Sequence, residues 1–235
     1  MLTAEHINCS YGKKQVLFDV SLNVNRGDIA LLIGSNGSGK STLFKCLYKL
    51  KSFTQETGSA FIFDDHDLSK TKTQNLLKTG LAYIPQSGFY YEQLTVRENL
   101  EIPALNDDRP ERKRKMEEIL AIFPMLAPTL EKRPAQISGG ERQLMNLAAT
   151  LQHRPAMLLL DEPFNGLSLK NLEMVRAQLT NLHQQTGCTI LMIEHRIKEA
   201  LPMANRLFGL KLGRMKEVGL GDKTNIEESI TAILI

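Results

Sequence analysis

Short, unbroken runs of apolar residues recur along the chain and predict the strands of a buried sheet. Such a run, bounded by polar positions, is typical of a strand covered on both faces of a parallel sheet. The runs are residues 29–33, 81–84, 157–161 and 188–193. Between them, apolar residues follow helical spacing at Leu43, Phe44, Leu47 and Leu50, and again over residues 169–185 before Gly187. This alternation of strands and helices predicts an α/β fold.

Both ends of the chain show a different pattern. Residues 2–24 alternate apolar and polar positions on either side of a polar turn at residues 10–14, which predicts an antiparallel β add-on ahead of the core. We expect a further strand at residues 58–63, a turn at 64–67, and a hairpin at 206–218 with Gly213 in its turn. A short helix is expected between His195 and Ala200. Ile226, Ile230 and Ile233–Ile235 form an apolar end that we expect to pack on the core.

The middle of the chain has few strand signals. Residues 92–100, 112–123 and 141–151 each carry a helical pattern, and proline-containing breaks separate them. We therefore interpret the stretch from residue 87 to residue 151 as an α-helical insertion. The α/β core, with its antiparallel add-on, is expected to occupy residues 1–86 and 152–235.

Composition and charge narrow the class of protein without defining it. The chain has 235 residues, a formal net charge of +3 and three widely spaced cysteines. This charge is too small to imply a nucleic-acid partner, and the basic segment 109–115 lacks interleaved aromatics, so we interpret it as a solvated helix face. The cysteines suggest neither a disulfide framework nor a zinc site. We find no apolar stretch of about twenty residues and no signal peptide at the first residues.

One glycine-rich segment carries clear chemistry. Residues 34–42 match the pattern G-x-x-x-x-G-K-[ST], directly after an apolar run and before a helical pattern. Glycines let the backbone press its amides against phosphate oxygens, Lys40 can reach the β- and γ-phosphates, and Ser41 can offer its hydroxyl to Mg²⁺. We predict a nucleotide phosphate site made of Gly34, Ser35, Asn36, Gly37, Ser38, Gly39, Lys40, Ser41 and Thr42.

Further candidates follow other predicted strands. Asp161 and Glu162 end one apolar run, at the edge of an open sheet where ligands bind. Asp161 is expected to hold Mg²⁺ and Glu162 to polarise an attacking water, although two acids could also simply cap a turn. Taken alone, a histidine after a strand, like His195, is more often an ordinary turn residue, and so is a glutamine in the position of Gln86. Ser138-Gly139-Gly140 alone would be a capped helix start.

Taken together, these motifs resemble the ATP-binding subunit of ABC transporters along nearly the whole chain. The matching features are Tyr11, the phosphate loop, Gln86, Ile137–Glu141, Leu158–Pro163 and His195. The resemblance implies a single ABC ATPase domain over residues 1–235, with a RecA-like phosphate-loop core, a mostly parallel sheet and the helical insertion as a subdomain. It also implies that ATP and Mg²⁺ are the cofactors.

The resemblance assigns a role to each motif. Tyr11 would stack on adenine, Gln86 would contact the metal beside Ser41 and Asp161, and His195 would face the γ-phosphate. Lys40, Glu162 and His195 would be the catalytic residues. Ser138, Gly139 and Gly140 would contact ATP bound to a second ATPase subunit, so that two chains enclose two ATP molecules.

Some positions depart from the usual family pattern. Ile137 stands where leucine is usual, Glu141 where glutamine is commonest, Ser168 where many members carry aspartate, and Ala149 where arginine is usual. The importers of branched-chain amino acids tolerate Glu141 and Ser168, and the chain resembles their ATPases most. The ATPase that extracts lipopolysaccharide from the inner membrane is an alternative. A non-transport ABC ATPase or a phosphate-loop kinase fits the motifs less well.

The resemblance also implies partners and a location. We expect transmembrane permease subunits, which would dock near residues 86–100, and a second ATPase subunit in a homodimer or heterodimer. An importer would also work with a substrate-binding protein, and we expect no nucleic-acid partner. The chain would be cytoplasmic and associate peripherally with the cytoplasmic face of the inner membrane.

Overall fold

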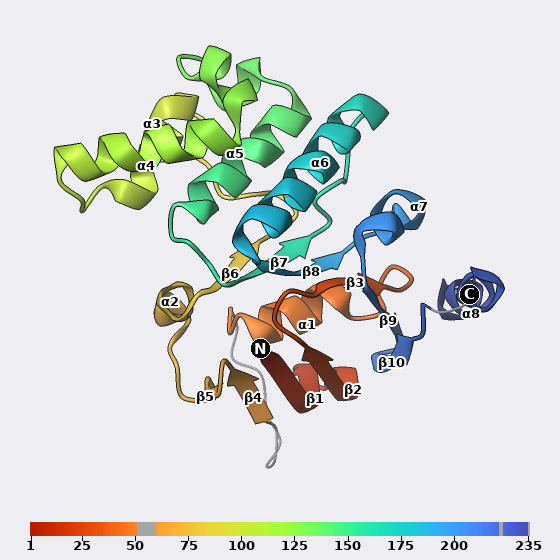
Figure 1. Cartoon of the computed structure of the whole chain (residues 1–235). Coiled ribbons are helices and arrows are strands. Elements are labelled where there is room, and N and C mark those ends of the chain that lie inside the picture. Colours follow the sequence, from red (N-terminus) through yellow and green to blue (C-terminus); the bar gives the residue numbers. More distant parts are fainter. Residues whose placement is uncertain (51–59, 221–222, 235) are drawn as a thin grey trace.

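The computed structural model describes residues 1–50, 60–220 and 223–234 and contains two β-sheets (Figure 1). The larger sheet has the order β10-β9-β3-β8-β7-β6, and its strands from β9 to β6 are parallel. Only β10 runs antiparallel, as the second strand of a hairpin. The strands are β3 (Ile29–Ile33), β6 (Leu81–Ile84), β7 (Met157–Asp161), β8 (Thr189–Ile193), β9 (Arg206–Lys211) and β10 (Arg214–Val218).

The smaller sheet is antiparallel, with the order β2-β1-β4-β5. Its strands are β1 (Leu2–Tyr11), β2 (Lys14–Val24), β4 (Ala60–Phe63) and β5 (His66–Asp67). The predicted turn at 64–67 is therefore wrong in part. Asp64 and Asp65 alone make the turn, both with positive φ, and the next two residues pair back onto β4. Residues 58 and 59 of the predicted strand lie outside the described residues.

Helices lie on both sides of the large sheet. They are α1 (Lys40–Leu47), α2 (Thr73–Leu76), α3 (Val96–Glu101), α4 (Arg109–Ile122), α5 (Gly139–Leu151), α6 (Leu169–Thr186), α7 (Ile197–Ala200) and α8 (Lys223–Leu234). Short 3₁₀ turns occur at Leu77–Thr79, Ile102–Ala104, Pro124–Thr129, Pro134–Gln136 and Leu201–Met203. In Figure 1, α1 lies on the same side of the large sheet as the antiparallel sheet, and α3–α6 lie on the other side.

Alternating side chains of the central strands enter two hydrophobic cores. In β3, Ile29, Leu31 and Ile33 pack in the core shared with α5 and α6, while Ala30 and Leu32 pack in the core shared with α1 and β1. The strand is buried at every position, which is why its sequence is continuously apolar. The predicted α/β class with a mostly parallel sheet, an antiparallel sheet and a helical stretch is confirmed.

Helix capping moves several predicted helix starts. Thr95 and Glu98 form a capping box, so α3 begins at Val96 and not at residue 92. Asp108 accepts the backbone N–H of Glu111 at 2.9 Å, and α4 therefore begins three residues earlier than predicted. Helix α5 likewise begins at Gly139, two residues before the predicted start, because Ser138 and Glu141 form a capping box there.

The ends of the other predicted helices are set by backbone geometry. Helix α1 ends at Leu47 because Lys49 has a φ of +52°, so Leu50 is not part of the helix and is exposed. Helix α6 ends before Gly187, whose φ of +66° is the left-handed conformation that glycine adopts easily.

The expected hairpin at residues 206–218 is present as β9 and β10.

The C-terminal apolar residues pack on the core, as predicted. Ile226 and Ile233 on α8 are buried, and Ile230 packs against the same core. A β-carbon built on Gly209 would lie 2.2 Å from Cδ1 of Ile233, so helix and strand β9 are in close contact. Ile235 lies outside the described residues.

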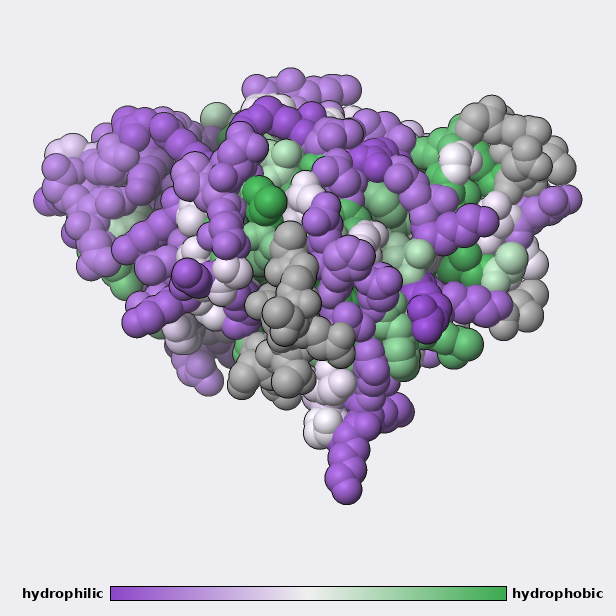
Figure 2. Space-filling model, turned by 90° about the horizontal axis from the view of Figure 1, so that it is seen from below, coloured by the Kyte–Doolittle hydropathy of each residue, from purple (hydrophilic) through white to green (hydrophobic). Residues whose placement is uncertain are grey.

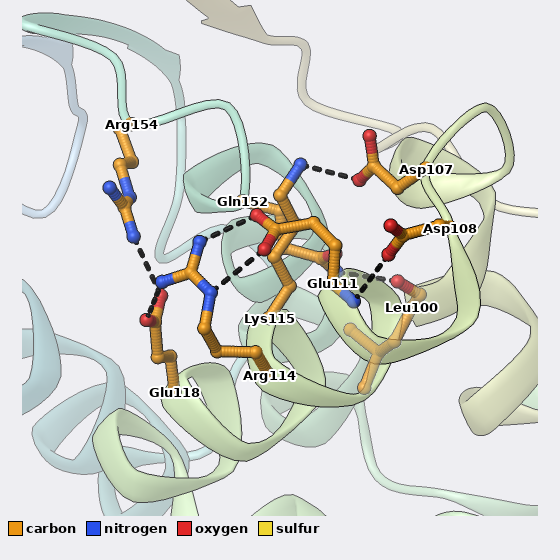
Figure 3. A network of polar contacts seen from close by, with 9 residues as sticks. All are labelled: Leu100, Asp107, Asp108, Glu111, Arg114, Lys115, Glu118, Gln152 and Arg154. Carbon is orange, nitrogen blue, oxygen red and sulfur yellow. Dashed lines mark hydrogen bonds and ion pairs between the residues drawn. The ribbon is translucent and has the colours of Figure 1, made fainter.

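In the basic segment at the start of α4, Arg109, Lys113 and Arg114 are exposed, as expected of a solvated helix face, whereas Arg112 and Lys115 are half-buried (Figure 3). Arg114 contacts both Glu111 and Glu118, and Arg154 reaches Glu118 from the loop after α5. Lys115 pairs with Asp107 at 2.6 Å. Lys113, Arg114 and Lys115 of the segment are therefore each paired with a neighbouring carboxylate.

Figure 2 shows the molecule from below the view of Figure 1. This face is largely hydrophilic, with smaller, separate hydrophobic areas. Among helices of the described residues, none combines the length and hydropathy that crossing a bilayer requires.

Candidate active site

The loops that follow four neighbouring strands meet at the carboxyl edge of the large sheet. The strands lie in the order β3, β8, β7, β6 and are parallel, so all four chain segments leave the sheet on the same side. The phosphate-loop segment follows β3, His195 follows β8, Glu162 follows β7 and Gln86 follows β6. This edge is where ligands of open α/β sheets bind, and the predicted site residues meet there.

The segment from Gly34 to Thr42 forms a tight loop that leads into α1. A β-carbon on Gly34 would lie 2.2 Å from the carbonyl oxygen of Leu210, so only glycine fits. Gly37 and Gly39 have φ values of +80° and +109°, and Gly39 stands at the N-cap of α1 without any capping side chain. The first amides of the helix are thus left to a ligand, and an anion is the ligand that a helix N-terminus favours.

Lys40 is held inside this loop. It is only 5% exposed, and its Nζ donates to the carbonyl oxygens of Gly34 and Ser35 at 2.8 and 3.1 Å. Burial lowers the pKa of its ammonium, which the nearby carboxylates of Glu162 and Asp161 partly offset. Among the described residues, Ser38 Oγ is a buried oxygen without a hydrogen-bond partner. A phosphate group would supply acceptors for both side chains.

Asp161 connects the loop to the strand β7. Its Oδ1 accepts from Ser41 Oγ at 3.3 Å, and its Oδ2 accepts from Tyr83 at 3.2 Å. Asp161 is 5% exposed, and burial raises the pKa of its carboxyl group. The described residues contain no cluster of three or more His, Cys, Asp or Glu that could hold a metal. One hydroxyl and one carboxylate nevertheless fit Mg²⁺, which commonly binds one or two protein oxygens and otherwise phosphate and water.

This environment predicts that Asp161→Asn stabilises the ligand-free protein. A folded-state pKa above the unfolded value contributes stability that is present below pH 3.8 and is lost as the pH rises through the folded pKa. At neutral pH the ionised carboxylate is therefore unfavourable, and an isosteric amide removes it. Urea unfolding without nucleotide should give a higher midpoint for Asp161→Asn at pH 7, and the difference should shrink on acidification. An equal or lower midpoint at pH 7 would contradict this.

Glu162 stands at the centre of a three-residue contact. Its Oε2 accepts from Gln86 Nε2 at 2.8 Å, and its Oε1 lies 3.0 Å from His195 Nε2. The φ of Glu162 is +54°, an uncommon value for a residue with a side chain. The structure therefore brings three predicted site residues from three different loops into direct contact.

Ser138, Gly139 and Gly140 lie apart from this cluster. Ser138 Oγ accepts the backbone N–H of Glu141, whose carboxylate accepts the N–H of Ser138 in return. Within the described residues, no hydrogen bond joins these three residues to the segment 34–42 of the same chain. The reciprocal cap gives Glu141 a physical role in place of the glutamine that is commonest there.

Close packing orients this second motif. A β-carbon on Gly140 would lie 2.7 Å from Cβ of Asn171, and one on Gly139 would lie 3.3 Å from Leu167. Ser168 caps α6 by accepting the N–H of Asn171 at 3.3 Å, a role that aspartate fills equally well.

Tyr11 and Ala149, which the sequence analysis also named, lie at the borders of the site. Tyr11 is 40% exposed at the end of β1, where it pairs with Lys14 in β2. Two residues further along β2, Val16 approaches the phosphate loop, with Cγ1 3.4 Å from a β-carbon built on Gly39. Ala149 lines a cavity of about 510 Å³ bounded by β6, α5 and the aromatic segment 89–91.

Sequence reasoning missed Glu194 and Tyr83. Glu194 is 2% exposed and directly precedes His195, and Tyr83 donates to Asp161 from the neighbouring strand. An ionisable residue at the end of an apolar run is the one signal that points to Glu194, whereas nothing in the sequence marks Tyr83. Burial raises the pKa of both side chains.

The fold and the loop define a phosphate-loop nucleotide-binding protein, and the comparisons give its family. A protein-family profile described as ABC transporter matches residues 17–165. The chain is 32% identical to the high-affinity branched-chain amino acid transport ATP-binding protein BraG of Pseudomonas aeruginosa. The match extends over 227 residues and covers 96% of each chain. The chain belongs to the ABC transporter family and is an ATPase of the kind that the family couples to transport.

Other relatives and solved structures agree with this family. The chain is 33% identical to the probable branched-chain amino acid transport ATP-binding protein LivF of Archaeoglobus fulgidus, over 92% of this chain and 90% of that one. It is 29% identical to the lipopolysaccharide export system ATP-binding protein LptB of Haemophilus influenzae, over 100% and 97%. A dimeric ATP-binding cassette bound to ADP and Pi superposes with a TM-score of 0.81 at 26% identity, covering 94% of this chain and 100% of that one.

Proposed function

We propose that this chain is the ATP-hydrolysing subunit of an ABC transporter and powers the movement of branched-chain amino acids through separate membrane subunits. The observation that carries the proposal is its similarity to BraG over 96% of both chains, which includes the phosphate-loop, acid-pair and histidine segments of this chain. The geometry of the carboxyl edge supports it, because nucleotide loop, acid pair and histidine meet there.

Each residue of the edge has a chemical task in this proposal. The loop amides and Lys40 would hold the phosphates, while Ser41, Asp161 and Gln86 would supply oxygen ligands to Mg²⁺. When bound, Mg²⁺ would neutralise part of the charge on the phosphate oxygens. Glu162 accepts a proton from the attacking water, and His195 holds the Glu162 carboxylate and faces the γ-phosphate. The 3.0 Å separation of these two side chains supports their joint action.

The proposal requires a second ATPase subunit. Ser138, Gly139 and Gly140 belong to the helical subdomain, residues 87–151, and make no hydrogen bond to their own phosphate loop in the described structure. They would contact the γ-phosphate held by the other subunit, while Tyr11 of the core, residues 1–86 and 152–235, stacks on adenine. Hydrolysis removes that contact, so the pair can close and open in each cycle.

The permease subunits would dock beside Gln86. The 510 Å³ cavity there is lined by Phe89 and Tyr91, which are 67% and 60% exposed. Exposed aromatic side chains at a concave surface are typical of protein interfaces. The chain would thus lie at the cytoplasmic face of the membrane, and an importer would add a substrate-binding protein.

The substrate distinguishes the proposal from its alternative. BraG and LivF are named for branched-chain amino-acid transport, and LptB, at 29% identity over the full chain, is named for lipopolysaccharide export. Deleting the gene in its own organism should abolish high-affinity uptake of labelled leucine, isoleucine and valine. Restoring the intact gene should recover uptake, and restoring Lys40→Ala should not. Normal uptake together with retained lipopolysaccharide in the inner membrane would favour the alternative.

A further inference from the structure

The buried carboxylate of Glu194 joins two loops of the active site. Its Oε1 accepts the backbone N–H of Phe164 at 2.6 Å, in the loop after β7. Its Oε2 accepts the N–H groups of His195 and Arg196 at 3.0 and 3.2 Å, in the loop after β8. Three backbone donors from segments about thirty residues apart in sequence therefore converge on one side chain that is 2% exposed.

The two loops carry the residues that contact each other at the site. Glu162 lies two residues before Phe164, and His195 directly follows Glu194. Glu162 keeps a positive φ of +54°, and such a conformation is unfavourable for a residue with a side chain and persists only where the surrounding structure holds it. The bond from Phe164 to Glu194 restrains the backbone just after this residue, and the bond from His195 restrains the histidine side of the contact.

Packing alone does not explain why a carboxylate occupies position 194, at the buried end of β8. Burying an ionised acid is unfavourable, and an apolar side chain at the end of an apolar strand would avoid that cost. Only a carboxylate offers two acceptor oxygens and no donor, so it can accept from both loops at once. Glutamine would turn an N–H group toward one set of donors, and aspartate is one methylene shorter.

We propose that Glu194 is a positioning residue for ATP hydrolysis, which holds Glu162 and His195 at contact distance by tying the loop after β7 to the loop after β8. The inference rests on the proposed catalytic roles of Glu162 and His195. Glu194 itself makes no contact with the reacting atoms in this scheme; it acts only through the two backbone segments.

The test compares variants of the full-length chain. Glu194→Gln and Glu194→Asp should each lower kcat by about 10–100-fold, the effect typical of losing a residue that orients metal-binding side chains from behind. The KM for ATP should stay within about twofold, because the phosphate loop is unchanged. The matched control is Asp28→Asn. Asp28 is also buried and accepts from Asn25, Asn205 and Arg206, but at the opposite edge of the sheet. It should lose stability and keep its kcat.

A second measurement does not depend on turnover. The His195 ring should change its NMR signals in Glu194→Gln but not in Asp28→Asn, because only the former releases the histidine loop. An unchanged kcat with unchanged His195 signals would overturn the proposal, as would equal losses of kcat in Glu194→Gln and Asp28→Asn. If wild type released no phosphate while the His195 signals responded to Glu194→Gln, the proposed function would fail together with a role of Glu194 in hydrolysis, and only the structural tie between the two loops would stand.

Discussion

Replacing Glu162 with glutamine is expected to lower ATP turnover by about 10²–10⁴-fold, the usual contribution of a general base. An amide does not accept the proton of the attacking water, but it has the same size and can still contact Gln86 and His195. The phosphate loop is untouched, so ATP binding should remain. Because the γ-phosphate then persists, the two subunits should stay together.

Three measurements check this expectation. Phosphate release gives turnover, titration with a fluorescent ATP analogue gives binding, and light scattering after gel filtration gives the oligomeric state with ATP. Glu117→Gln, an exposed glutamate of α4 that pairs with Lys113, is the matched control and should behave as wild type in all three. Full turnover in Glu162→Gln would exclude Glu162 as the base.

A mixture of two inactive variants is expected to regain activity if the site is completed by a second subunit. Lys40→Ala removes the ammonium that holds the phosphates, and Ser138→Arg blocks the motif that would contact ATP on the other subunit. Each variant alone should lose most of its phosphate release, since both sites of its homodimer are damaged. In a mixed dimer one site combines the intact Lys40 of one subunit with the intact Ser138 of the other.

The recovered rate should depend on the mixing ratio, with a maximum near equal amounts, where mixed dimers are most abundant. A double variant carrying both changes is the control, and adding it to wild type should give no such maximum. Activity that stays at the level of the single variants at every ratio would show that Ser138 does not act across the dimer.

The phosphate loop could be predicted from sequence because its chemistry is local. Gly34, Gly37 and Gly39 are needed for close backbone approach and positive φ within a few residues of one another. The apolar runs of β3 and β7 were likewise readable, since burial on both faces leaves no polar position. Helix starts were less accurate, because Thr95 and Asp108 define them through single hydrogen bonds.

The meeting of Gln86, Glu162 and His195 could not be derived from the residues alone. Strand β8 lies between β3 and β7, although it follows both in sequence, and β6 lies beside β7. A sequence lists strands without their order in the sheet, so only the resemblance to a known family suggested that these side chains converge. Glu194 shows the limit most clearly, since its donors come from two loops separated by a whole helix.

By itself, the sequence predicted the chemistry available to this protein: a loop for phosphate, acids expected to serve metal and water, a histidine, and a candidate second anion motif in a helical insertion. Those features depend on residue type and short spacing. The tertiary structure decided which of them act together, because strand order and buried hydrogen bonds set distances that no spacing along the chain encodes. It brings Glu162 and His195 into direct contact and ties the loops that carry them through Glu194, and within the described residues it gives Ser138 no hydrogen bond to the phosphate loop of its own chain.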